Sequence, residues 1–69
     1  MKHDSVDNQV YAFIRAYIAE NGHPPTLREI AAALYLSTGA VYRCLDKLEA
    51  QGRITRKPNR SRGITLLDK

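Results

Sequence analysis

Apolar residues recur with helical spacing near the start of the chain. They stand at offsets of 0, 4, 7, 8, 11 and 12 residues, which places them on one face of an α-helix: Val6, Val10, Phe13, Ile14, Tyr17 and Ile18. Asp4 or Ser5 can cap the N-terminus of this helix, and Gly22 can adopt the left-handed conformation that ends it. The pattern predicts a helix from about 5 to 21.

A rigid turn separates this helix from a second one. Residues 22–25 read Gly-His-Pro-Pro, and each proline fixes its own φ and disfavours a helical conformation in the residue before it. Thr26 and Glu29 follow with the spacing of a capping box, in which each side chain accepts a hydrogen bond from the other residue's backbone N–H. The second helix should therefore start at Thr26 and end near Tyr35, and its buried stripe should be Leu27, Ile30, Ala31 and Leu34.

A third apolar stripe follows after a turn of about three residues. Residues 37–39 read Ser-Thr-Gly, which is typical of a helix cap and not of a helix interior. The next helix should cover about 38 to 51 and stop at Gly52, and its apolar positions are Val41, Cys44, Leu45 and Leu48. Two helices joined by so short a turn indicate a helix-turn-helix, with Leu36 filling the angle between them.

The periodicity changes after Gly52. Residues 53–56 and 63–67 alternate polar with apolar side chains and contain β-branched residues, which predicts two short strands. Residues 57–62 between them are basic and rich in turn formers, so the two strands should pair as a hairpin with a charged tip. The predicted fold class is α+β, mainly α: a winged helix-turn-helix with three helices followed by a two-stranded wing. At 69 residues, the chain 1–69 should be one domain.

Positive charge is concentrated at one end of the sequence. The net charge is +4, and residues 53–69 alone hold six Lys or Arg against one acid. A localised basic cluster attracts polyanions, of which nucleic acid is the commonest in a cytoplasm. The alternative is a solvated surface that keeps the protein in solution.

Other function classes are disfavoured by composition. The longest uncharged run, 30–42, is far shorter than the ~20 apolar residues of a membrane span, and the N-terminus lacks the apolar core of a secretory signal, so we expect a cytoplasmic protein. Cys44 is the single cysteine, so we expect no disulfide within the chain. The other potential zinc ligands, His3 and His23, are distant in the sequence, so we expect no metal site either. No nucleophile–base pair or paired carboxylate stands at helical spacing, so we expect no enzyme, no cofactor and no small-molecule ligand.

Two motifs of the sequence are specific, Pro-Pro-Thr at 24–26 and Ser-Arg-Gly-Ile at 61–64, and the leucines of 45–48 give weaker support. Together these motifs resemble the DNA-binding domain of LexA-type repressors. The resemblance implies the winged helix-turn-helix fold and double-stranded DNA as partner. The sequence departs from those repressors in two places. The turn before the third helix is one residue shorter than in the repressors, and the first turn of the third helix reads Ser-Thr-Gly-Ala at 37–40. We therefore do not expect this chain to recognise the family's operator sequence. The self-cleaving peptidase domain of such repressors is not in this chain, so we expect no cleavage-based induction in the chain alone.

In such a fold, the third helix would enter the major groove and read base edges with its first turns. Arg43 is the best candidate, because a guanidinium can bond the O6 and N7 of guanine together; the alternative is pairing with Asp46. Gly39 would allow close approach, and Ala40 could touch a thymine methyl. Tyr42 could contact a phosphate or a sugar, or it could pack beneath the wing. Lys47 faces outward and is a further candidate. Ser37 and Thr38 could donate to phosphates, although helix capping alone also explains these two residues.

Phosphate contacts are expected from two further segments. Thr26 and Arg28 open the second helix, although the capping box is the preferred role for Thr26. In the wing, the cations Arg56, Lys57, Arg60 and Arg62 would follow the backbone or enter the minor groove, with Asn59 and Ser61 supplying turn geometry and further donors. We expect at least two of the four cations to contact phosphate.

Two functional hypotheses follow. The leading one is a sequence-specific, double-stranded DNA-binding transcriptional regulator, in particular a repressor. The alternative is a winged-helix protein-interaction module, such as an antirepressor or adaptor, that reads no DNA. One module buries only about 600–1,000 Å² on DNA, so a homodimer on spaced half-sites is one route to useful specificity.

Overall fold

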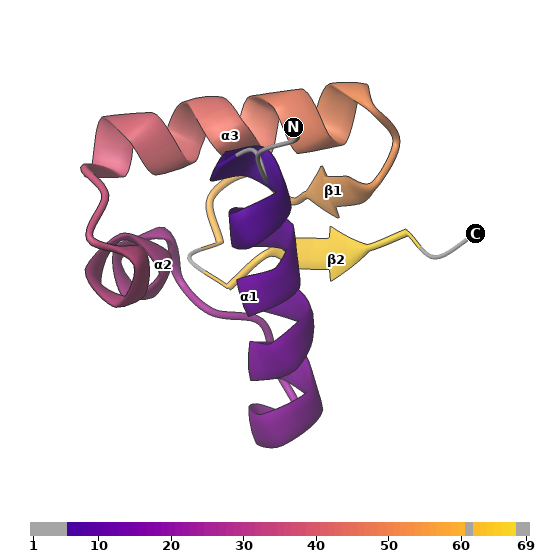
Figure 1. The fold of residues 1–69 in the computed structure, drawn as a ribbon. Helices are drawn as coiled ribbons and strands as arrows, with labels where there is room; N and C mark the ends of the chain where they lie inside the picture. Colours follow the sequence, from indigo (N-terminus) through magenta and orange to yellow (C-terminus); the bar gives the residue numbers. More distant parts are fainter. Residues whose placement is uncertain (1–5, 61, 68–69) are drawn as a thin grey trace, which may run out of the picture.

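Three helices precede a two-stranded hairpin in the computed structural model, which describes residues 6–60 and 62–67 (Figure 1). The elements are α1 (Val6–Asn21), α2 (Leu27–Leu34), α3 (Thr38–Ala50), β1 (Ile54–Arg56) and β2 (Ile64–Leu66). The predicted winged helix-turn-helix is confirmed, and the predicted bounds agree to within one or two residues. The proposed cap at Asp4 or Ser5 and the wing residue Ser61 lie outside the described residues.

α1 ends as its sequence predicts. Gly22 adopts φ +78°, and its N–H donates to the Ile18 carbonyl at 2.8 Å, which closes the last turn. Val10 and Ile14 are fully buried, whereas Val6 at the other end is 42% exposed. α1 stands steeply against α3, whose body crosses over its N-terminal end (Figure 1).

α2 begins with the predicted capping box. The Glu29 N–H donates to Thr26 Oγ1 at 3.1 Å, and the Thr26 N–H donates to Glu29 Oε1 at 2.8 Å. The helix ends at Tyr35, which adopts the left-handed conformation with φ 58° and ψ 42°. Glycine is the residue that adopts this conformation without steric cost, so a tyrosine here holds local backbone strain.

α3 supplies the largest share of the core. Ser37 caps it by accepting a hydrogen bond from the Ala40 N–H at 3.1 Å, and all four predicted apolar positions of the helix are buried. These four pack with Val10 and Ile14 of α1, with Ile30 and Ala31 of α2, and with one isoleucine from each strand. Leu36 packs against this core from the turn, as expected.

The wing is a short antiparallel pair. Ile54 faces Leu66 and Arg56 faces Ile64, and Ile54 and Ile64 turn inward onto the core. Gly63 lies at the base of the loop, where an added Cβ would come within 2.9 Å of the Lys57 carbonyl oxygen. The loop therefore approaches itself too closely for any side chain at Gly63.

Candidate nucleic-acid interface

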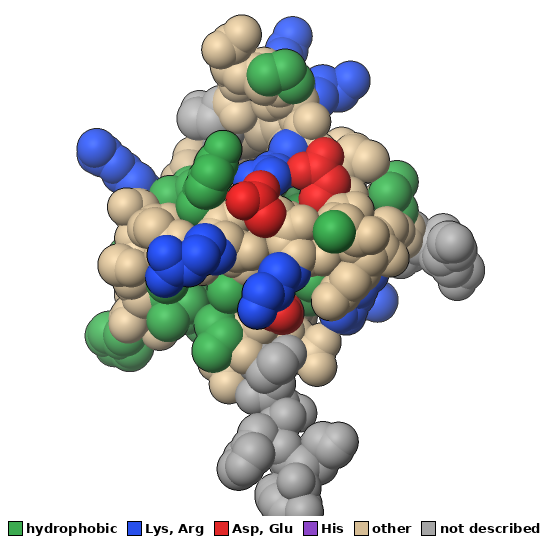
Figure 2. Space-filling model, turned by 90° about the horizontal axis from the view of Figure 1, so that it is seen from above, with side chains coloured by type: hydrophobic (Ala, Val, Ile, Leu, Met, Phe, Trp, Pro, Cys, Tyr) green, Lys and Arg blue, Asp and Glu red, His purple; other side chains and the backbone are tan. Residues whose placement is uncertain are grey.

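The outer face of α3 is open to solvent at most of the positions predicted to read bases. Thr38, Gly39, Tyr42, Arg43 and Lys47 are exposed, while Ala40 is half-buried. A Cβ added at Gly39 would meet nothing within 4 Å, so the start of the helix presents bare backbone. Figure 2 looks onto this side of the molecule and shows acidic side chains among basic ones at its centre, with further basic side chains standing out at its edges.

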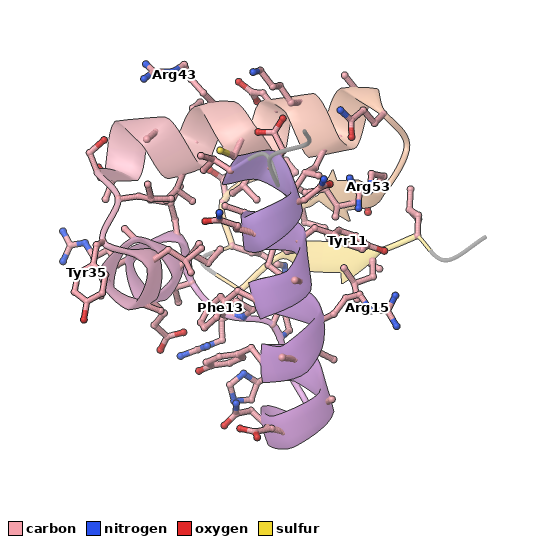
Figure 3. All side chains as sticks on the ribbon, in the orientation of Figure 1. Tyr11, Phe13, Arg15, Tyr35, Arg43 and Arg53 are labelled. Carbon is pink, nitrogen blue, oxygen red and sulfur yellow. The ribbon has the colours of Figure 1, made fainter. Side chains whose placement is uncertain are left out.

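Arg43 extends from α3 away from the body of the protein (Figure 3). Within residues 6–60 and 62–67 it makes no hydrogen bond and no ion pair. The alternative considered from the sequence, a pair with Asp46, is not formed, because Asp46 pairs with Arg56 instead. The guanidinium of Arg43 is therefore available to an external acceptor.

Arg56 is held against α3 by two carboxylates. Its Nη2 pairs with Asp46 Oδ1, and its Nε donates to Glu49 Oε1 at 2.9 Å. Its guanidinium carbon lies 5.2 Å from the centre of the Tyr42 ring, and its side chain is only 22% exposed. Burial opposes the charged form, but the hydrogen bonds that Arg56 donates to Asp46 and Glu49 outweigh it and raise the pKa of Arg56.

Tyr42 contacts the wing, and the phosphate or sugar contact expected of it stays a prediction. The side chain lies beside the wing through the contact with Arg56, yet it remains 55% exposed. Its phenol can therefore still reach a ligand that covers α3.

Arg62 is held in the same way against α2. Its Nη1 and Nη2 each donate at 2.9 Å to a different oxygen of Glu29, and Nη1 also donates to the Pro24 carbonyl at 2.9 Å. The hydrogen bonds from Arg62 and from the Thr26 backbone lower the pKa of Glu29 to about 2. Sequence reasoning placed both Arg56 and Arg62 among the DNA contacts, whereas the structure engages both in ion pairs within the chain.

The cations at the wing tip face solvent. Lys57, Asn59 and Arg60 are exposed, and none of the three side chains forms a hydrogen bond or ion pair within the part of the chain that the structure describes. Asn59 adopts φ 65°, which is the turn conformation expected of it. An open hollow of about 800 Å³ lies between the wing, α3 and the start of α2, and Arg28, Tyr42, Asn59 and Arg60 are among its lining residues.

The hydroxyls expected to contact phosphate have structural roles. Thr26 Oγ1 and Ser37 Oγ both accept hydrogen bonds from backbone N–H groups as helix caps, so the capping interpretation is confirmed for both. Their hydroxyl hydrogens remain able to donate. Arg28, two residues after Thr26, is exposed.

Sequence reasoning missed three contacts that join distant segments. They are the Arg62–Glu29 pair, the two carboxylates around Arg56, and the stacking of Arg53 on Tyr11, in which the guanidinium carbon lies 4.1 Å from the ring centre. Tyr11 and Arg53 lie next to each other in Figure 3. An acid and a base many residues apart carry no local signal of pairing, so only the fold could have revealed these contacts.

The described part of the chain also contains Cys44 and other groups that could bind a metal ion. Cys44 is buried, as expected, and burial raises the pKa of its thiol, with a further contribution from the hydrogen bond to Asp7. Among the described residues, no three His, Cys, Asp or Glu side chains gather as they would around a metal ion. No helix within those residues has the length and apolar character needed to cross a membrane.

Comparison with known proteins identifies the family. The family model described as the LexA DNA binding domain matches residues 5–63. LexA repressor 1 of Geobacter sulfurreducens is 57% identical over 60 residues, which are 86% of this chain and 30% of the relative. The LexA repressors of Geobacter metallireducens and Clostridium kluyveri are 46% and 43% identical, over 87% and 90% of this chain and 30% and 31% of the relatives. This chain thus spans about a third of the length of these curated relatives and belongs to the LexA DNA-binding domain family.

Proposed function

We propose that this chain is the sequence-reading, double-stranded DNA-binding domain of a transcriptional repressor. The observation that carries the proposal is the unengaged guanidinium of Arg43 on the exposed face of α3 (Figure 3), and the wing adds the free, exposed cations Lys57 and Arg60. The names of the relatives, which are repressors, agree with it. The proposal assigns no catalytic step to the chain, and it implies the compartment that holds the DNA, which is the cytoplasm in bacteria.

In the proposed complex α3 lies in the major groove, where each base pair has a distinct pattern of donors and acceptors. Arg43 donates to O6 and N7 of a guanine, which is the commonest specific contact of this kind. Gly39 lets the start of the helix approach the floor of the groove, and Ala40 lies close enough for contact with a thymine methyl. Lys47 and Tyr42 flank Arg43 along the helix and reach toward the backbone.

Phosphate contacts in the proposed complex come from both sides of α3. Lys57 and Arg60 follow the backbone from the wing, while Arg28 approaches from the first turn of α2. Asn59 contributes a further donor at the wing tip, and Thr26, Ser37 and Thr38 can donate hydroxyl hydrogens. These contacts fix the register of α3 on the duplex and supply most of the affinity, and they carry no sequence information.

Repression requires only that the bound domain occlude a promoter. A single module buries about 600–1,000 Å² on DNA, so we further propose that two copies bind spaced half-sites as a homodimer. The longer relatives have about two thirds of their chains outside the matched region, which leaves room for a separate dimer interface.

Selection from a random duplex library tests the proposal. The chain is incubated with the library at two salt concentrations, and the retained duplexes are sequenced. An inverted repeat is expected, and its enrichment should weaken at the higher salt. A single short motif would mean that a monomer reads one half-site and would remove the homodimer. No retention at either salt would overturn DNA binding in favour of a protein-interaction module.

A further inference from the structure

Arg62 is surrounded by acceptors from a segment far away in sequence. Besides the two oxygens of Glu29 and the Pro24 carbonyl, its Nη1 lies 3.4 Å from the Tyr17 hydroxyl and 3.3 Å from His23 Nδ1. Arg62 donates three hydrogen bonds of 2.9 Å, which use three of the five N–H donors of its guanidinium. Arg62 is therefore already engaged before any DNA phosphate arrives.

Glu29 connects three parts of the fold through one carboxylate. Its Oε1 accepts from the Thr26 N–H in the capping box and from Arg62 Nη1, while its Oε2 accepts from Arg62 Nη2. The turn before α2, the first turn of α2 and the base of the wing loop are thus joined at a single point. Bidentate pairing of this kind fixes orientation as well as distance.

The wing depends on contacts with the rest of the fold, because it has little internal stability. Each strand is only three residues long, and an isolated two-stranded hairpin is marginal in water. Gly63, next to Arg62, accepts a hydrogen bond from the Lys57 N–H at 2.9 Å, so the position of Arg62 also sets the position of the loop that carries Lys57 and Arg60.

We propose that the Arg62–Glu29 pair is a clasp that sets the position of the wing relative to α2, and that Arg62 is a positioning residue and not a phosphate contact. The phosphate contacts of the wing are then Lys57 and Arg60, whose side chains are free. This inference rests on the proposed DNA-binding function and refines it.

The clasp predicts an effect opposite in sign to simple electrostatics. Glu29→Gln removes a negative charge near the DNA-facing surface, which alone should tighten the binding of a polyanion. Gln at this helix position preserves the capping box, so α2 keeps its start. Loss of the bidentate pair should nevertheless weaken binding about threefold or more, because the wing cations are no longer held in place. Glu20→Gln, the same charge change on the exposed side of α1, should not weaken it.

The salt dependence separates positioning from folding. If the wing loosens, the slope of log K against log salt should become shallower by about 0.9 to 1.8 in Glu29→Gln, although Lys57 and Arg60 are both still present. A protein that is only partly unfolded would bind less with an unchanged slope, and that result would overturn the clasp. Binding by Glu29→Gln as tight as that of the unmodified chain would overturn it as well.

A double-mutant cycle gives a second, independent test. Glu29→Arg should weaken DNA binding in the unmodified chain, where it repels Arg62, and tighten it in Arg62→Glu, where the clasp is restored in reverse. If Glu29→Arg changed the DNA affinity in the same direction in the unmodified chain and in Arg62→Glu, the two residues would not act through each other, and the clasp would be overturned. These comparisons all require that the unmodified chain bind duplex DNA; if it does not, the proposed function itself has failed.

Discussion

Arginines of this domain differ in role because their neighbours differ. Arg56 and Arg62 face carboxylates on α3 and α2, and their ion pairs raise the pKa of both guanidinium groups. Arg43 lies one turn from Asp46 on α3, yet it makes no ion pair within the described chain, and Asp46 pairs with Arg56. The charge of a residue therefore says less about DNA contact than the geometry around it.

Arg43→Ala should reduce discrimination between the preferred site and an unrelated duplex. A bidentate contact to guanine contributes about 1–3 kcal/mol of discrimination, whereas binding to unrelated DNA should change little. Titrations of both duplexes by fluorescence anisotropy would measure the ratio. Arg15→Ala is the matched control, because Arg15 is exposed on α1 and points away from α3 (Figure 3). An equal loss on both duplexes would exclude base reading by Arg43.

Lys57→Gln and Arg60→Gln should weaken binding to all duplexes alike. Each phosphate contact releases counterions, so each substitution should reduce the slope of log K against log salt by about 0.9. Arg15→Gln should leave that slope unchanged. The slopes can be taken from binding titrations between about 50 and 200 mM salt. A wild-type slope in both wing variants would show that neither cation contacts the backbone.

Among the elements, the helix ends are where sequence and structure agree best. The capping box of α2, the serine cap of α3 and the left-handed Gly22 are local patterns, and the structure contains all three. The link between the wing and α2 is different, because Glu29 and Arg62 are 33 residues apart and meet only once the fold has brought the wing loop to the first turn of α2. Local chemistry predicts where an element starts, and packing decides which side chains then meet.

Tyr35→Gly should stabilise the end of α2. Tyr35 holds a left-handed conformation while its side chain is 95% exposed, so glycine removes strain and gives up little packing. After allowance for the greater freedom of glycine in the unfolded chain, a gain of about 0.5–1 kcal/mol in the free energy of unfolding is expected. Urea unfolding would measure it, with Tyr35→Ala as the control that keeps the strain. A glycine variant less stable than the alanine variant would refute the strain argument.

The Arg62–Glu29 pair should make part of the stability dependent on acid pH. Glu29 has its pKa lowered from an ordinary 4.5 to about 2, so its contribution is complete above about 4.5 and is lost as the pH falls toward 2. Thermal unfolding of the unmodified chain and of Glu29→Gln should therefore differ most near neutral pH, and the difference should shrink across that window. A difference that stays constant from pH 6 to pH 2 would contradict the lowered pKa.

For the whole molecule, the sequence predicts the architecture, but it does not predict which cations pair within the chain and which stay free. The apolar stripes predict which faces are buried, because burial follows periodicity. The concentration of basic residues after Gly52 predicts a charged wing. Which of those cations remain free depends on carboxylates brought in by tertiary packing, as Asp46 and Glu49 are for Arg56, and no spacing rule contains that information.

Methylation protection of guanine N7 in a selected duplex tests directly whether α3 reads the major groove, since this atom lies on the major-groove edge. The bound chain should protect a guanine N7 in each recognised half-site, and Arg43→Ala should lose that protection while Lys57→Gln keeps it at saturating protein. Binding without protection of any guanine N7, or protection that survives Arg43→Ala, would show that α3 does not read the major groove through Arg43.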